Sequence, residues 1–282
     1  MQLFAPAKIN LSFKILGRRE DGFHEIDTLM TPISICDELT IEPDQAGKGI
    51  AFSCDDPSVP PGDDNLVVRA ARRFFEEIQS EPAVRIFLRK RIPHGAGLGG
   101  GSSDAASTLL GLNESFGAPV AISRLTSMAA GIGSDVPFFL GQGAARCRGR
   151  GEIVEPVSGL PRISLLLLKP EFGMPTPAAY GHWRESRELP GVDYLPQRLG
   201  SLVLENDLER PVFEKHLFLA HLKGWLRGQP EVAGALLSGS GSTVFAVMRE
   251  GVGAEALAER ARRELDPRLW TCLCETIAAE RR

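Results

Sequence analysis

The residues best suited to chemistry lie between Pro93 and Ser103, in the glycine-rich run PHGAGLGGGSS. Glycine has no Cβ atom, so its backbone N–H group can approach an anion closely and its φ angle can be positive. A helical pattern follows the run, with Leu109 and Leu112 on its apolar face, and Ser102 or Ser103 is expected to cap the helix start. Because a helix start offers free N–H groups and partial positive charge, the run predicts a phosphate-binding loop.

Other glycine-rich patterns fit this run less well. Gly95 to Gly100 satisfies G-x-G-x-x-G, but no acidic residue ends a second strand about 20 residues later, as a dinucleotide-binding fold would require. No Lys-Ser or Lys-Thr pair follows the glycines, so the P-loop pattern fails, and the VAIK, HRD and DFG sequences of protein kinases are missing. A flexible linker is disfavoured as well, because a strand pattern at 84–88 and an amphipathic helix flank the run closely.

Polar residues that could take part in a functional site also lie outside the glycine-rich run. The pattern at 8–15 predicts a strand with isoleucine, leucine and phenylalanine on one face, which leaves Lys8 and Asn10 on the polar face. Asp135 stands two residues before a proline at an expected helix start, so it is either a capping residue or a functional carboxylate. Phe23 and His24 end a charged turn that contains a glycine, a place where side chains often contact ligands.

Length and composition predict a globular protein. The chain has 282 residues, enough for one large or two ordinary domains, with 43% hydrophobic and 24% charged residues. The net charge of −4 argues against a nucleic-acid-binding surface. The five scattered cysteines include no CxxC pair and indicate reduced thiols. The most apolar run, 163–168, is too short to cross a bilayer, and the first residues show no signal-peptide pattern. We therefore expect a cytoplasmic protein without a membrane or nucleic-acid partner.

The periodicity of the chain indicates a mixture of strands and helices. In the first half we expect strands at 8–15, 27–35, 38–42 and 84–88, and helices at 66–78 (capped by Asp63 or Asp64) and 123–131. We place a domain boundary near 160, which gives domains 1–160 and 161–282. In the second half we expect strands at 163–169, near 233–237, 243–248 and 270–275, and helices from 175, 212–226 and 254–265. This loose alternation predicts a split βαβ sandwich.

Four separated stretches together resemble one family. PAKINL at 6–11, the glycine run with the following SDAA, GSDVP at 133–137 and LSGSGS at 237–242 resemble the GHMP small-molecule kinases. That family's phosphate loop has the form P-x-x-x-G-L-G-x-S-S, and this chain carries it with one additional glycine. The resemblance implies an α+β, two-domain GHMP-kinase fold, with an N-terminal ribosomal-S5-like domain and a C-terminal ferredoxin-like split βαβ domain.

The resemblance also implies the chemistry of phosphoryl transfer. Asp135 matches the family's catalytic aspartate and would accept the proton of the alcohol, and Lys8 matches the lysine that orients this carboxylate. Mg²⁺ is expected with ATP, without an assigned ligand, and Asp104 is expected to face away from the phosphates and either to cap or to pair locally. The ATP phosphates would contact Pro93, Gly95, Ala96, Gly97, Leu98, Gly99, Gly100, Gly101, Ser102 and Ser103.

The acceptor expected from the resemblance carries a cytidine diphosphate group. PAKINL, DGFH and GLGGGSSDAA together are similar to those family members that phosphorylate the 2-hydroxyl of a methylerythritol unit in non-mevalonate isoprenoid precursor synthesis. Phe23 and Tyr180 would then enclose the cytosine, His24 would read its edge, and Asn10 would also contact the substrate. Two alternatives remain: a GHMP kinase for another small alcohol (mevalonate, homoserine or a sugar), and a catalytically silent nucleotide sensor. The chain could be a monomer or a homodimer.

Overall fold

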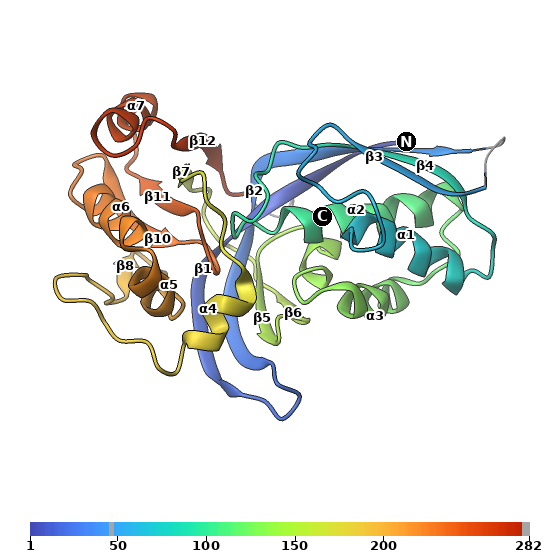
Figure 1. Ribbon diagram of the computed structural model, residues 1–282, viewed down its shortest axis with the longest axis horizontal. Helices are drawn as coiled ribbons and strands as arrows, with labels where there is room; N and C mark the ends of the chain where they lie inside the picture. The colour runs from blue at the N-terminus through green and yellow to red at the C-terminus, as the bar shows by residue number, and fades with distance from the viewer. Residues whose placement is uncertain (45–47, 278–282) are drawn as a thin grey trace.

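Two sheets form the framework of the protein. The computed structural model describes residues 1–44 and 48–277. Within these residues the larger sheet has eight strands and the smaller sheet has four. Figure 1 shows the smaller sheet on the left and most of the larger sheet in the centre and on the right, with the long strands β1 (Gln2–Arg18) and β2 (His24–Pro43) between the two parts. This arrangement agrees with the predicted two-part α+β fold.

The long hairpin of β1 (Gln2–Arg18) and β2 (His24–Pro43) is the centre of the larger sheet. The sequence predicted two strands, 27–35 and 38–42, where the structure has one. Both segments pair with β1, and the register shifts between them: Pro6 lies opposite Cys36, whereas the next residue, Ala7, lies opposite Ile33. The residues between Ile33 and Cys36 are accommodated by a bulge instead of ending the strand.

The remaining strands of the larger sheet come from both halves of the chain. The path is β3-β4-β2-β1-β9-β8, and β5 pairs with β2 and β6. The short parallel strand β3 was not expected from the sequence. The bounds are β3 (Gly49–Cys54), β4 (Ala83–Arg89), β5 (Ala145–Gly149), β6 (Ile153–Pro156), β8 (Gln197–Leu199) and β9 (Leu202–Asn206).

Three helices cover one face of the larger sheet: α1 (Leu66–Glu77), α2 (Gly100–Ser115) and α3 (Ile122–Ile132). Their apolar residues share one core with the inner face of β2 and β4 (Figure 1). Asn65 caps α1, since its Oδ1 accepts a hydrogen bond from the N–H of Val67 at 2.8 Å. The expected caps Asp63 and Asp64 were therefore wrong by one or two residues.

The smaller sheet is antiparallel, in the order β10-β11-β7-β12, which is the order of a ferredoxin-like split βαβ unit. Two segments of helix lie where one was expected at 212–226, because His216 has non-helical angles (φ −131°, ψ 75°). The bounds are β7 (Ser164–Lys169), α4 (Thr176–His182), α5 (Glu209–Lys215), α6 (Leu217–Arg227), β10 (Val232–Leu237), β11 (Val244–Met248), α7 (Glu255–Glu264) and β12 (Trp270–Glu275).

The two halves of the chain are connected through the larger sheet. Strand β9 runs parallel to β1, with Ser12 opposite Glu205, although it lies beyond residue 160. A domain boundary near residue 160 stays a proposal. None of the helices in the described part of the chain combines the length and the hydropathy needed to cross a bilayer.

Candidate active site

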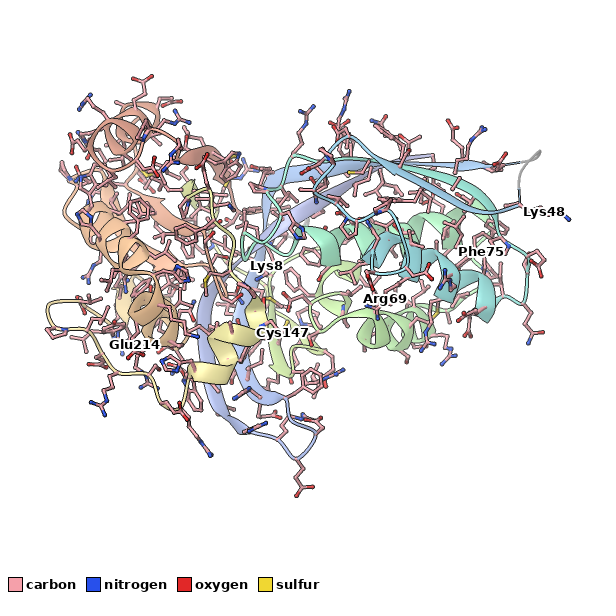
Figure 2. The ribbon with its side chains drawn as sticks, in the orientation of Figure 1. Lys8, Lys48, Arg69, Phe75, Cys147 and Glu214 are labelled. Carbon is pink, nitrogen blue, oxygen red and sulfur yellow. The ribbon has the colours of Figure 1, made fainter. Side chains whose placement is uncertain are left out.

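A cavity of about 1030 Å³ collects most of the residues that the sequence singled out. Its walls come from β1, the turn at 22–24, the glycine loop, the turn before residue 136, helix α4 and the turn at 239–240. In Figure 2, Lys8 lies where the elements of the two sheets meet. The fold therefore brings together residues that are far apart in the sequence.

The glycine loop leads from β4 into helix α2. Gly99 occupies the N-cap position of α2 with φ 71°, and among the described residues no side chain caps the helix. The expected caps Ser102 and Ser103 were wrong, because the helix already begins at Gly100. Ser103 is buried, whereas Ser102 lines the cavity. The uncapped first turn leaves backbone N–H groups available to an anion.

Gly97 shows why this loop needs glycine. Its φ is 74°, and a Cβ atom there would lie 2.2 Å from the carbonyl oxygen of Ser238. Ser238 Oγ donates a hydrogen bond to the Gly97 carbonyl at 3.0 Å, and Thr243 N–H donates to the Ala96 carbonyl at 3.1 Å. The turn at 238–242 thus packs directly on the glycine loop.

Lys8 lies in the floor of the cavity with 4% of its surface exposed. Its Nζ donates hydrogen bonds to Asn10 Oδ1 at 2.7 Å and to the Gly97 carbonyl at 3.0 Å. Asn10 Nδ2 in turn donates to Thr28 Oγ1 at 2.8 Å. Burial lowers the pKa of Lys8, and the nearby carboxylate of Asp135 raises it in part. The amine is therefore fixed in position and more acidic than a free lysine.

Asp135 faces Lys8 across the cavity. Its Oδ2 lies 3.7 Å from Lys8 Nζ, and 34% of its side chain is exposed. The short 3₁₀ helix that follows, η1 (Pro137–Leu140), has Val136 at its N-cap position and no side-chain cap in the described structure. The interpretation of Asp135 as a capping residue is therefore wrong. The carboxylate is free to meet a substrate hydroxyl beside a lysine, the arrangement that general-base chemistry requires.

The aromatic candidates line the other end of the cavity. His24 and Tyr180 have ring centroids 5.2 Å apart, and Tyr180 also contacts Phe13 edge-on at 6.2 Å. Phe23 is 48% exposed and makes no ring contact with Tyr180 within the described residues. Burial, together with Arg18 and Arg184, lowers the pKa of His24. At neutral pH its imidazole is therefore mainly uncharged and can both donate and accept hydrogen bonds.

Three arginines at this end were missed from the sequence. Arg18, Arg150 and Arg184 line the cavity, and the Arg150 guanidinium lies 4.7 Å from the centroid of the Phe23 ring. The sequence has arginines at 146, 148 and 150, and their alternating spacing does not indicate which of them reaches the cavity. In the structure Arg146 and Arg148 contact Asp27, whereas Arg150 lies in the turn after β5 and reaches the cavity.

A second missed group lines the cavity beside the start of α2. Its apolar side chains suit contact with a planar ring, whereas its amide and its amine are already hydrogen-bonded within the protein. The turn before α1, the first residue of α1 and the residue after β4 supply it, and none of these segments carried a motif. Its members are Val59, Pro60, Asn65, Leu66 and Lys90.

Comparison with known proteins identifies the family. Residues 65–143 match the family described as GHMP kinases N terminal domain, and residues 194–267 match GHMP kinases C terminal. A 4-diphosphocytidyl-2-C-methyl-D-erythritol kinase from Methylacidiphilum infernorum (isolate V4) is 42% identical over 97% of this chain and 96% of that protein. The chain belongs to this family of GHMP kinases. A second member, from Synechococcus sp. (strain JA-3-3Ab), is 40% identical over 87% of this chain and 84% of its own length.

Solved structures place the fold in the same family. A crystal structure of 4-(cytidine 5'-diphospho)-2C-methyl-D-erythritol kinase matches with a TM-score of 0.79 and 37% identity, over 99% of this chain and 100% of that one. Homoserine kinase from Cytophaga hutchinsonii has a TM-score of 0.71 at 16% identity, over 99% of this chain and 96% of its own. The second likeness shows the GHMP kinase fold and nothing about the acceptor.

Proposed function

We propose that this GHMP kinase transfers the γ-phosphoryl group of ATP to the 2-hydroxyl of 4-diphosphocytidyl-2-C-methyl-D-erythritol. The observation that carries the proposal is the ion pair of Lys8 and Asp135, 3.7 Å apart in the cavity that the glycine loop also lines. Family membership supports ATP as the donor. The names of the 35–42% identical relatives support this acceptor.

In this proposal the phosphates of ATP lie on the backbone N–H groups of 95–101 and on the first turn of α2. The N-terminal charge of the helix and the N–H groups stabilise the anion without a dedicated side chain. The base of ATP takes the cavity wall formed by Val59, Pro60, Asn65, Leu66 and Lys90. The γ-phosphate then points toward Lys8, which the Gly97 carbonyl already holds beside the loop.

The chemical step needs a proton acceptor and charge stabilisation. The acceptor's hydroxyl oxygen attacks the γ-phosphorus, the bond between the γ-phosphorus and the bridging oxygen breaks, and ADP leaves with that electron pair. Asp135 takes the hydroxyl proton, and Lys8 stabilises the negative charge that spreads over the transferred group. Asn10 keeps the lysine amine in position through its 2.7 Å hydrogen bond, and its predicted contact with the substrate is part of the proposal.

Mg²⁺ is expected to bind together with the phosphates of ATP. Mg²⁺ is usually held by one or two protein oxygens together with nucleotide phosphates and waters, rather than by a full protein cage. In keeping with that, the described residues contain no cluster of three or more His, Cys, Asp or Glu side chains suited to a metal. Phosphate oxygens of ATP and waters would therefore supply most of its ligands, and no protein ligand is assigned to it. The ion would neutralise phosphate charge.

The acceptor's cytidine diphosphate group takes the aromatic end of the cavity. The cytosine ring lies between Phe23 and Tyr180, and neutral His24 hydrogen-bonds its edge. Arg150 and Arg184 supply positive charge for the diphosphate. Mevalonate, homoserine and sugars have no planar ring for this end, which disfavours the alternative acceptors. A silent nucleotide sensor would not need the pair of Lys8 and Asp135.

The proposal is tested by comparing acceptors that differ only in the base. A site that hydrogen-bonds a base edge rejects an analogue that leaves its groups unpaired, by at least about tenfold in kcat/KM. The measurement is ADP release with ATP and either the cytidine or the uridine form of the acceptor. Equal kcat/KM values for the two forms would remove the role given to His24.

A further inference from the structure

A second polar cluster connects the two ends of the phosphate loop. Asp37 on β2 is fully buried, and its Oδ1 accepts hydrogen bonds from the backbone N–H groups of Arg91 (2.6 Å) and Ile92 (2.8 Å), just before the loop. Its Oδ2 accepts a hydrogen bond from Lys90 Nζ. The same Nζ donates to Oδ2 of Asp104 at 3.0 Å, on helix α2 just after the loop. The local pairing expected for Asp104 is thereby confirmed, whereas its expected orientation away from the phosphates is not, because Asp104 lines the cavity.

This cluster lies next to the loop backbone. A Cβ atom on Gly100 would lie 3.0 Å from Ile92 Cγ2 and 3.3 Å from Lys90 Nζ, so the amine sits directly against the first residue of α2. Lys90 and Asp104 line the cavity at this point. Asp104 is 2% exposed, and its Oδ1 has no hydrogen-bond partner in the described structure. A change in charge here would be felt by an anion on the loop.

The charges of the cluster depend on one proton. Two carboxylates, Asp37 and Asp104, face one ammonium group. Burial raises the pKa of Asp104 to about 8; Lys90 lowers it in part and Asp37 raises it. Burial lowers the pKa of Lys90, but Asp104 and Asp37 raise it further, so the amine stays protonated. At neutral pH Asp104 therefore keeps its proton and the cluster carries no net charge.

Further acidic groups approach the cluster from the segment after β3. Asp55 Oδ1 accepts a hydrogen bond from the backbone N–H of Lys90 at 2.8 Å, and the charge of Lys90 acts on Asp56. Neither carboxylate contacts Asp104 directly, so the pKa of Asp104 is set by its burial first and then by Lys90 and Asp37.

We propose that Asp37, Lys90 and Asp104 form a positioning cluster that fixes the phosphate loop for the donor nucleotide and removes negative charge from beneath it. Asp37 holds the backbone that enters the loop, and Lys90 ties Asp37 to the helix that leaves it. The two aspartates act through the loop and are not catalytic. The inference rests on the proposed function, because it requires ATP in the glycine loop.

The first test follows nucleotide affinity against pH. Calorimetry with ADP, without acceptor, is run on the parent and on Asp104→Asn from about pH 7 to about pH 9.5. As Asp104 loses its proton, the parent's Kd should rise about three- to tenfold from repulsion between carboxylate and phosphates, whereas Asp104→Asn should keep a neutral cluster and avoid this rise. Any rise that remains in the variant belongs to Lys8, whose pKa is also lowered.

Two outcomes are decisive in that experiment. Equal pH profiles for the parent and Asp104→Asn would overturn the role of the cluster while ATP binding, and with it the proposed function, stands. A parent that binds no ADP at any pH would overturn both.

The second test addresses the backbone contacts of Asp37. Asp37→Asn keeps an oxygen for the N–H groups of Arg91 and Ile92, whereas Asp37→Ala leaves both without a partner. Asp37→Ala should raise KM for ATP at least tenfold more than Asp37→Asn does, with kcat at saturating ATP within about threefold of the parent. Equal KM values for the two variants, or a fall in kcat at unchanged KM, would contradict the proposal. If Asp37→Ala does not fold, the pH profile of Asp104→Asn decides alone.

Discussion

Replacing Asp135 by asparagine separates binding from chemistry. The change is nearly isosteric, and because Val136 takes the N-cap position of η1, no helix cap is lost. At 3.7 Å, two unit charges attract by about 4 kcal/mol at an effective dielectric constant of about 20. Since 34% of Asp135 is exposed to solvent, we discount this attraction to about 1–2 kcal/mol of folding free energy. Such a loss lowers Tm by several degrees and leaves the protein folded at 25 °C.

The expected loss of turnover is much larger. Removing a general base costs about 10²–10⁴-fold in rate, which is about 2.7–5.4 kcal/mol of transition-state stabilisation. The amide keeps the shape of the carboxylate but cannot take the hydroxyl proton. Nucleotide affinity should stay equal or increase slightly, because a negative charge near the phosphates is gone. The assay is kcat at saturating substrates beside a calorimetric Kd for ADP.

Lys8→Ala and the double variant complete this experiment. Both single variants should lose kcat, and the double variant should fall well short of the product of the two losses, because the two residues act as a unit. Burial lowers the pKa of Lys8, so kcat of the parent should decline at a pH below the range in which free lysine titrates. Losing the carboxylate of Asp135, which raises that pKa, should move the decline of any residual activity to lower pH. Near-normal turnover of Asp135→Asn would refute the catalytic assignment.

Three further predictions concern the walls of the cavity. Gly97→Ala should weaken ADP binding at least tenfold, because the added Cβ would lie 2.2 Å from the Ser238 carbonyl oxygen. The control Gly191→Ala changes a glycine with a similar φ in open space, so it should cost only about 1–2 kcal/mol of stability and leave ADP binding unchanged. Equal effects of the two variants on the calorimetric affinity for ADP would refute the steric account. Arg150→Ala should raise KM for the acceptor more than Arg148→Ala does, because Arg150 lines the cavity whereas Arg148 contacts Asp27 and Glu155 outside it. A larger rise of KM in Arg148→Ala, measured by steady-state kinetics, would exclude Arg150 from the acceptor site. Tyr180→Ala should weaken acceptor binding by about 1–3 kcal/mol and leave ADP binding unchanged; a larger loss for ADP would place Tyr180 elsewhere.

Local patterns predicted those parts of the site that depend on neighbouring residues. Alternation placed Lys8 and Asn10 on the polar face of a strand, and the glycine run between a strand and a helix indicated an anion site. The start of α2 was misplaced, because Gly99 in the left-handed region begins the helix before either serine. At α1 the cap is Asn65 and not one of the expected aspartates, because several neighbouring residues are able to cap a helix and only the path of the backbone selects one of them.

Contacts between distant segments could not be predicted from spacing. Lys8 is buried because the glycine loop and the turn at 238–242 close over it, and no local pattern encodes that packing. Arg150 reaches the cavity because β5 ends at Gly149, which turns the next side chain inward from the row of Arg146 and Arg148. The resemblance to GHMP kinases supplied the role of Asp135, while its 3.7 Å distance from Lys8 came only with the fold.

The central claim is that Lys8 and Asp135 direct the γ-phosphoryl group of ATP to one hydroxyl of a cytidine-diphosphate-linked alcohol. The most direct measurement is ³¹P NMR of a reaction that contains the protein, ATP, Mg²⁺ and 4-diphosphocytidyl-2-C-methyl-D-erythritol. The account predicts one new phosphomonoester on the 2-hydroxyl, formed in equal amount with ADP and faster than with mevalonate, homoserine or galactose. ADP without that phosphomonoester, or faster phosphorylation of an acceptor that lacks the cytidine diphosphate group, would contradict it.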